Sequence, residues 1–239
     1  MANGIYAAAA GLAAQQDRID ALSNDLANVG TTGFKSERIG FRDLLYGAER
    51  GIPVGGGAAA VDAGRSSVQG ALVTSTNPLA LAIVGPGYIQ VRRADGTTAL
   101  TRDGDLQIDS AGSLVTADGE QLVPPVKLPA KTAAAAVTVG PDGTISVACR
   151  TVGKIAVVDV PAPSGLIALG ANDFAATTGS GSASAASGSK LVQGQLEQSN
   201  VDVAAAMSDL LDAQQSYSLL SHAISTQDQL LAMANELRQ

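Results

Sequence analysis

Residues 203–237 read VAAAMSDLLDAQQSYSLLSHAISTQDQLLAMANEL, and this stretch decides the fold. Its apolar and small side chains recur every seven residues, in two rows that lie three positions apart. A seven-residue repeat keeps one narrow stripe on the face of a slightly underwound helix, which is typical of a coiled-coil seam. The stretch therefore predicts a long helix, from about Asn200 to Leu237, that lies along other helices. The first row is Val203, Leu210, Tyr217, Ile224 and Leu231, and the second is Ala206, Ala213, Leu220, Gln227 and Ala234.

A second stripe of the same kind stands near the start of the chain. It predicts a first helix from about Asn3 to Asn28, which ends before Gly30 and Gly33. The simpler alternative for both helices is ordinary amphipathic packing on their own domain. Because an ordinary helix follows a period closer to 3.6 residues, four and five successive heptads favour the coiled coil. The rows of the first stripe are Ile5, Leu12, Ile19 and Leu26, and Ala8, Gln15, Leu22 and Val29.

Between the two helices the pattern changes. Residues 34–69 show no clear period, and we expect an extended crossing segment in which Phe41–Tyr46 form a short helix or a turn. From Gly70 to about Val160, short apolar runs alternate with Asp-Gly pairs, which favour the left-handed geometry of hairpin turns. Residues 177–189 carry only small side chains and predict a flexible connector.

The sequence thus predicts an α+β protein in which long N- and C-terminal coiled-coil helices flank a small antiparallel β domain. Residues 1–33 and 190–239 would form the terminal helical core. Residues 34–69 would be the crossing segment, and residues 70–189 the β-rich outer domain with its connector at 177–189.

Composition excludes several classes of function. The formal net charge is −7 with no run of Lys or Arg, so we expect neither nucleic acid nor an anionic membrane as a partner. No segment is apolar for long enough to insert into a membrane, and no basic residue precedes the alanine-rich residues 7–14, so we expect no cleaved signal peptide. With Cys149 as a strand residue and His222 on a helix surface, we expect no metal site and no Cys-His or Ser-His catalysis.

The acidic residues of the β domain indicate turns and not calcium. Asp103, Asp105 and Asp109 resemble the start of a calcium loop, but Leu114 stands where that loop needs a glutamate. No phosphate-binding or dinucleotide fingerprint is present in the sequence. We therefore expect no cofactor and no enzymatic activity.

The second helix is apolar beyond its seam, for example at Leu219, Leu230, Met233 and Leu237. One partner helix cannot cover all of these side chains, and the chain has only one other long helix. We therefore expect the extra faces to meet other copies, in a repeating contact that builds a helical array. The predicted assembly interface is Ile5, Leu12, Ile19, Leu22, Leu26, Asn28, Val203, Met207, Leu210, Leu211, Tyr217, Leu220, Ile224 and Leu231.

Four blocks of sequence carry a resemblance to a known family. They are SNDLANV at 23–29 followed by TTGFK at 31–35, QGAL at 69–72 with NPLALAI at 77–83, GQLEQSNVD at 194–202, and AIST at 223–226. With these blocks in this order, the chain resembles the bacterial flagellar rod and hook proteins, which are the axial components of the basal body. Proximal-rod and distal-rod positions both remain open.

The resemblance implies a structural subunit of the flagellar basal body. Such a protein leaves the cytoplasm through the flagellar export apparatus without a cleaved leader. Its terminal helices then assemble with copies of itself and with other axial proteins into a tube that transmits torque, with the β domain outside. The alternative is an extracellular coiled-coil adhesin with a β-rich binding head, and an enzyme comes third.

Overall fold

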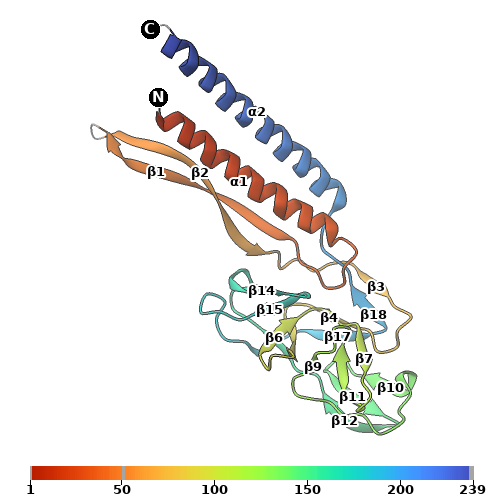
Figure 1. Ribbon diagram of the computed structural model, residues 1–239. Helices are drawn as coiled ribbons and strands as arrows, with labels where there is room; N and C mark the ends of the chain where they lie inside the picture. Colours follow the sequence, from red (N-terminus) through yellow and green to blue (C-terminus); the bar gives the residue numbers. More distant parts are fainter. Residues whose placement is uncertain (1, 50–51, 237–239) are drawn as a thin grey trace. The chain divides into compact units, whose positions relative to one another are not determined.

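The computed structural model describes residues 2–49 and 52–236, and the chain forms two compact units (Figure 1). The helix unit comprises Met1–Ala27, Glu37–Ala63 and Asp202–Gln239, and the β unit comprises Asn28–Ser36 and Gly64–Val201. The predicted α+β class is confirmed. In the part of the chain described, neither helix is long and apolar enough to span a membrane.

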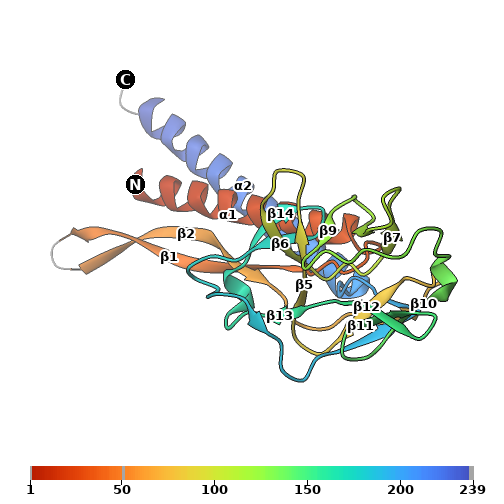
Figure 2. The same cartoon turned by 90° about the horizontal axis from the view of Figure 1, so that it is seen from below.

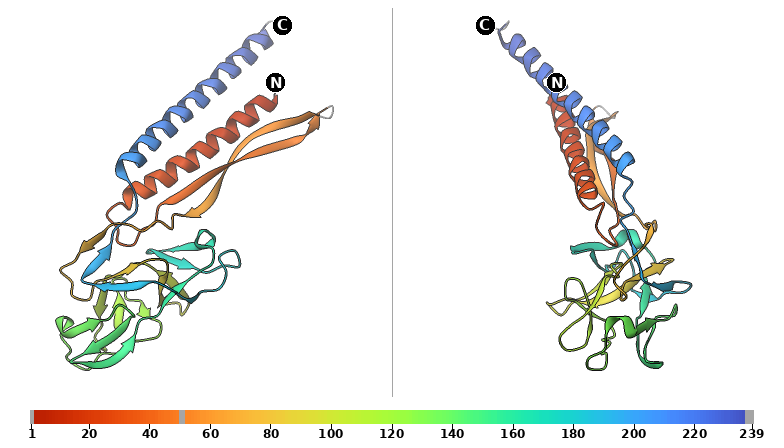
Figure 3. Two further views of the ribbon diagram at one scale, coloured as in Figure 1. Left: turned by 180° about the vertical axis from the view of Figure 1, so that it is seen from behind. Right: turned by 90° about the vertical axis from the view of Figure 1, so that its right-hand side faces the viewer.

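The helix unit contains both predicted helices. Helix α1 spans Ala2–Ala27 and helix α2 spans Val203–Glu236. Strands β1 (Glu37–Glu49) and β2 (Ile52–Arg65) pair as a two-stranded ribbon, and the two residues between them lie outside the described residues. Within this unit, α1 has α2 along one side and the ribbon along the other (Figures 1 and 3).

The short helix or turn predicted around residues 41–46 is wrong, because this stretch belongs to β1. Pairing with β2 gives the backbone N–H and C=O groups of both segments their partners. This strand pairing does not depend on a local apolar period, so the sequence pattern did not predict the ribbon.

Both helices have identifiable boundaries. The carboxylate of Asp202 accepts hydrogen bonds from the backbone N–H groups of Ala204 (2.9 Å) and Ala205 (3.3 Å), so Asp202 caps α2. The Ser199 hydroxyl instead accepts a bond from Val201 N, which corrects the predicted start of this helix by about three residues. After α1, the N–H of Thr31 bonds to the Asn28 carbonyl, and Gly33 has φ +69°, a conformation that favours glycine.

The two helices run antiparallel along a seam of small residues. Gly4 lies against Gln227 and Gly11 lies against Leu220, while Arg18 forms an ion pair with Asp209 at 3.2 Å. The most buried helical side chains in the unit follow the same spacing of seven residues, and small side chains allow close approach of the two backbones. They are Ala14, Ala21, Ala206 and Ala213, together with the carboxylate of Asp25.

The β unit is built from short antiparallel strands, as predicted (Figure 2). Two small sheets pair β3 (Leu72–Thr74) with β18 (Gln195–Glu197) and β4 (Leu81–Val84) with β17 (Lys190–Gln193). A three-stranded sheet contains β10 (Val137–Val139), β11 (Thr144–Val147) and β12 (Arg150–Lys154). The largest sheet contains β5 (Tyr88–Arg92), β6 (Thr98–Thr101), β7 (Leu106–Ile108), β8 (Leu114–Thr116), β9 (Gln121–Leu122), β13 (Val157–Asp159), β14 (Ile167–Gly170), β15 (Asp173–Ala175) and β16 (Ser184–Ala185).

Two apolar clusters hold these sheets together. The larger one is aliphatic and includes Leu81, Ile89, Leu106 and Ile145, each almost completely buried. The smaller one is centred on Tyr88 and Phe174, whose rings meet edge to face with their centroids 5.9 Å apart.

The turn predictions at Asp103 and Asp109 are confirmed, and the strand prediction for Cys149 is wrong. Asp103 and Asp109 accept hydrogen bonds from backbone N–H groups of their own turns. Cys149 is not a strand residue: it is exposed in the turn between β11 and β12, with φ +64°. The predicted connector at residues 177–189 contains strand β16 and the completely buried Ser180, and its flexibility stays a prediction.

Candidate assembly surface and buried junction

The outward face of α2 is the largest set of exposed apolar side chains in the helix unit. Each of these side chains is 51–71% exposed, although a helix of a single folded chain normally buries most of its large apolar residues. Large apolar side chains that stay exposed along one helix are typical of interaction sites. We call this set the outer stripe of α2, and it comprises Met207, Leu211, Leu219, Leu230 and Met233.

The structure divides the predicted interface residues of α2 into two groups. Leu210, Leu220 and Ile224 are half-buried, and Leu220 lies against Gly11 in the seam with α1. The others on this helix are exposed, namely Val203, Met207, Leu211 and Tyr217. The side chain of Leu231 lies outside the described residues, as does Leu237.

On α1 the predicted stripe is half-buried and is not the innermost face. The most buried residues are Ala14 and Ala21, because α1 packs against both α2 and the ribbon. Tyr6, which the sequence pattern did not single out, is 65% exposed. The half-buried predicted residues at this end of the chain are Ile5, Leu12, Ile19, Leu22, Leu26 and Asn28.

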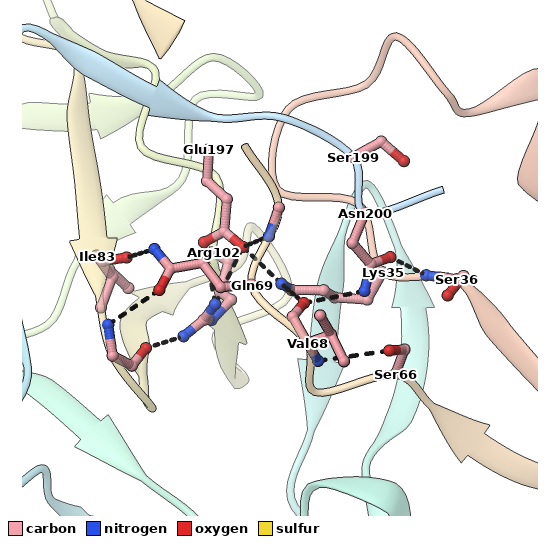
Figure 4. A network of polar contacts seen from close by, with 12 residues as sticks. Lys35, Ser36, Ser66, Val68, Gln69, Ile83, Arg102, Glu197, Ser199 and Asn200 are labelled. Atoms are coloured by element: carbon pink, nitrogen blue, oxygen red, sulfur yellow. Dashed lines mark hydrogen bonds and ion pairs between the residues drawn. The ribbon is translucent and has the colours of Figure 1, made fainter. Parts of the chain in front are cut away.

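A buried ionic cluster lies within the β unit, at the segments that lead to the two helices. The Glu197 carboxylate accepts hydrogen bonds from Lys35 Nζ at 2.5 Å and from Arg102 Nη1 at 3.0 and 3.1 Å (Figure 4). It also accepts the N–H of Gly70 at 2.9 Å. The side chains of Lys35, Arg102 and Glu197 are only 1–4% exposed. One carboxylate therefore pairs with two cations away from water.

Both cations also donate to backbone carbonyls. Lys35 Nζ donates to the Val68 carbonyl at 2.7 Å, and Arg102 donates to the carbonyls of Gly85 and Gly87. The Arg102 guanidinium lies 5.6 Å from the centre of the Tyr88 ring. Burial lowers the pKa of Lys35, and the hydrogen bond to Glu197 opposes that shift.

Backbone and amide contacts tie the same segments together. The N–H of Gly33 bonds to the Glu197 carbonyl at 2.8 Å, and Asn200 Oδ1 accepts the N–H of Ser36 at 2.8 Å. Asn200 Nδ2 donates to the Val68 carbonyl at 2.9 Å (Figure 4). We use the name junction for Lys35, Gly70, Arg102, Glu197 and Asn200.

Gly70 gives a direct test of the packing at the junction. A methyl group added at Gly70 would collide with the carbonyl oxygen of Gln198, so we expect Gly70→Ala to lower the free energy of unfolding by about 1–3 kcal/mol. Urea unfolding followed by circular dichroism measures this. The control is Gly30→Ala, where nothing lies within 4 Å of the added methyl and the change should stay within about 0.5 kcal/mol. Equal stability of the two variants would contradict the packing described.

A second, partly buried charge cluster in the β unit has the opposite composition, with one cation and two carboxyl groups. Arg93 Nε lies 3.4 Å from Glu120 Oε1 and 3.6 Å from Asp173 Oδ2, so one cation serves two carboxyl groups. Burial, and then the neighbouring Glu120 carboxyl, raise the pKa of Asp173 to about 7, while Arg93 opposes the shift. Asp173 is 2% exposed and therefore favours its protonated form in the fold.

Comparison with known proteins places these features in a family. Residues 5–35 match the family described as flagella basal body rod protein, and residues 192–237 match the flagellar basal body rod FlgEFG protein C-terminal region. Residues 82–147 match the flagellar hook protein FlgE/F/G D1 domain. Over its whole length, the chain is 37% identical to flagellar basal-body rod protein FlgG of Borreliella burgdorferi, of which it covers 99%.

The chain belongs to the flagellar basal-body rod protein family. It is 35% identical to FlgG of Caulobacter vibrioides and 32% identical to FlgG of Bacillus subtilis, in each case over 97% of both chains. This rod protein family is structural and not enzymatic. The membership leaves the adhesin alternative without support.

The sequence analysis did not predict the junction. Lys35 and Glu197 stand in the blocks TTGFK and GQLEQSNVD, which carry the resemblance, but no role follows for them from the pattern alone. One signal was available: each is a charged residue whose immediate neighbours in the sequence are uncharged. Only the fold shows that the two meet, because 162 positions separate them.

Proposed function

We propose that this chain is a structural subunit of the flagellar basal-body rod and that it assembles through its terminal helices. The outer stripe of α2 carries the proposal. It leaves five large apolar side chains in contact with water in the single chain. Burial of one such side chain contributes roughly 1.5–3 kcal/mol, so covering the stripe gives a strong drive toward association.

The partners are copies of the same chain and other axial proteins of the flagellum. Support comes from α2 itself, since its inner face packs on α1 while its outer stripe stays open. A contact between the outer stripe of one copy and the helices of the next repeats without closing, and it therefore generates a helical tube. In such a tube the β unit lies outside, and many helix contacts share the torque. The chain reaches the basal body through the flagellar export apparatus.

The helix contacts in the rod are of the coiled-coil type. Within one chain, Gly4 and Gly11 meet Gln227 and Leu220 at steps of seven residues, which is the spacing of such a seam. The exposed residues of the predicted interface, such as Val203 and Tyr217, lie beside this seam and complete it with side chains from neighbouring copies.

Replacing three residues of the outer stripe tests the proposal. With Leu211→Gln, Leu219→Gln and Leu230→Gln together in the chromosomal gene, we expect rods to be absent from isolated basal bodies and swimming to be lost. The purified variant should keep its melting temperature within about 4 °C, because each change is on the surface of the single chain. Electron microscopy of basal bodies and thermal unfolding measure the two outcomes.

The matched control makes three substitutions of the same kind on the β unit. Val73→Gln, Val84→Gln and Ile167→Gln also replace exposed apolar side chains, and we expect this variant to form rods. Normal rods with the triple variant of α2 would refute assembly through the outer stripe. Loss of rods in both variants would show that the effect is not specific to this face.

A further inference from the structure

We propose that Asp173 and Glu120 share one proton inside the β unit, and that this proton holds the β14–β15 hairpin on its sheet as a pH-sensitive latch. Asp173 is the first residue of β15, Glu120 directly precedes β9, and Arg93 directly follows β5. We use the name latch for these three residues. The inference concerns the β unit alone, so it depends neither on rod assembly nor on the helix unit.

The single cation of the latch does not satisfy both carboxyl groups. Arg93 Nε lies 3.4 Å from Glu120 and 3.6 Å from Asp173, whereas a strong charge-assisted hydrogen bond has an N–O distance of about 2.7–2.9 Å. Asp173 Oδ2 is buried, and no N–H or O–H group in the described part of the chain donates to it. A proton shared between the two carboxyl groups gives both a partner, because the protonated group donates to the carboxylate beside it.

The other groups around Asp173 do not supply the missing positive charge. Strands β14 and β6, which pair with β15 on its two sides, contain no titratable side chain. Asp118, in the turn between β8 and β9, adds a further negative charge, and Arg93 opposes it. Burial and the Glu120 carboxyl raise the pKa of Asp173 from 3.8 to about 7 in the closed hairpin. An open hairpin exposes the carboxyl to water and removes both causes of this shift.

The β14–β15 hairpin is the part of the sheet that the proton controls. Strand β14 lies at the edge of the sheet with all four residues exposed, and β15 pairs with β6 at two positions, Asp173 and Phe174 (Figure 1). Arg93 Nη1 also donates to the carbonyl of Leu169 in β14, at 3.5 Å. An edge hairpin with few pairings opens more readily than the interior of a sheet. Ionisation of Asp173 beside Glu120 therefore loosens the sheet first at this hairpin.

The direction of the pH dependence follows from the proton. The closed hairpin binds the proton more tightly than the open hairpin, so the open population grows as pH rises. Between the pKa of 3.8 and the raised pKa of about 7, it grows about tenfold for each pH unit, and above this interval it levels off. The hairpin is therefore closed in acid and loosened at neutral and alkaline pH.

Hydrogen exchange of the full-length chain at pH 5, 6, 7 and 8, followed by mass spectrometry, tests the latch. After correction for the intrinsic exchange rate at each pH, protection of residues 166–176 should fall about 10–100-fold from pH 5 to pH 8. At pH 8 it should lie at least about tenfold below the protection of the interior strand β5. In Asp173→Asn the fall should be less than about threefold, because asparagine is neutral at every pH.

Two further variants identify the role of the second carboxyl group. In Glu120→Gln the fall should shrink to less than about a third of its wild-type size, because the amide donates to the ionised Asp173. Asp142→Asn is the control, because it removes an exposed carboxylate from the turn before β11 and should leave the wild-type fall unchanged.

Three results would overturn the proposal. The first is equal protection of the wild-type hairpin at pH 5 and pH 8. The second is equal protection of the hairpin and β5 at pH 8, because the charge then acts only on the β unit as a whole. The third is an unchanged fall in Glu120→Gln, because the proton then needs no second carboxyl group. The wild-type series and Glu120→Gln decide the matter if Asp173→Asn does not fold.

Discussion

Replacing Glu197 by glutamine is expected to lower the free energy of unfolding by about 3–5 kcal/mol. Glutamine keeps the shape of the side chain but leaves the cations of Lys35 and Arg102 buried beside each other without an anion. Since a domain of this size is stabilised by about 5–15 kcal/mol in total, the loss is a large fraction of its stability. Urea unfolding at pH 7, followed by circular dichroism, measures the change.

Two further variants test whether the loss of stability comes from the unpaired buried cations and not simply from the loss of an acidic residue. Asp212→Asn removes an exposed carboxylate of α2 and should shift stability by less than about 0.5 kcal/mol. Adding Lys35→Met to Glu197→Gln removes one of the two unpaired cations, so the double variant should be more stable than Glu197→Gln alone. If Glu197→Gln unfolds at the wild-type urea concentration, the ionic cluster does not stabilise the fold.

Replacing Asp173 by asparagine is expected to make the protein more stable, by an amount that is larger at pH 8 than at pH 5. The pKa of Asp173 is raised from 3.8 to about 7 in the fold, so the folded state favours the protonated carboxyl. As pH rises through this interval, the unfolded chain loses its proton first and the wild type loses stability until both states are ionised. A difference of about three pKa units corresponds to about 4 kcal/mol, and the value of about 7 already includes the opposing effect of Arg93.

The measurement is the free energy of unfolding of both proteins at pH 5, 6, 7 and 8. We expect the gain from asparagine to grow across this range to about 2–4 kcal/mol at pH 8. Asp95→Asn is the control: this exposed carboxylate has a lowered pKa because of its hydrogen bonds to Thr97, so its removal cannot give a gain that grows above pH 5. A gain for Asp173→Asn that is the same at every pH would contradict the proposed protonation of the buried carboxyl.

The helices were predictable because their pattern is local and long. Heptads over residues 5–29 and 203–234 gave the boundaries of α1 and α2 to within about three residues. The inner face of α1 was less predictable. The pattern pointed to Ile5 and Leu12, yet Ala14 and Ala21 lie deepest, because the ribbon packs against α1 as a second neighbour. Ala14 and Ala21 fall outside both predicted rows of the first helix, and small residues give only a weak apolar signal, although close packing favours them.

The apolar period of the sequence could not predict the ribbon or the junction, for a different reason. Strands β1 and β2 are stabilised by pairing with each other, and their glycines and charges hide any alternation. The contact between Lys35 and Glu197 spans most of the chain, and a sequence does not show which charged residues will share a buried site. The outer stripe of α2, in contrast, was visible in the sequence, and the structure adds that nothing in the same described chain covers it.

The position of Cys149 has a practical consequence. It is the chain's one thiol, and it is exposed in a tight turn of the β unit, away from both helices in the sequence. A maleimide dye attached there would mark every molecule once and leave the helical surfaces unmodified. Stepwise photobleaching of such labelled particles would then count how many molecules one basal body contains.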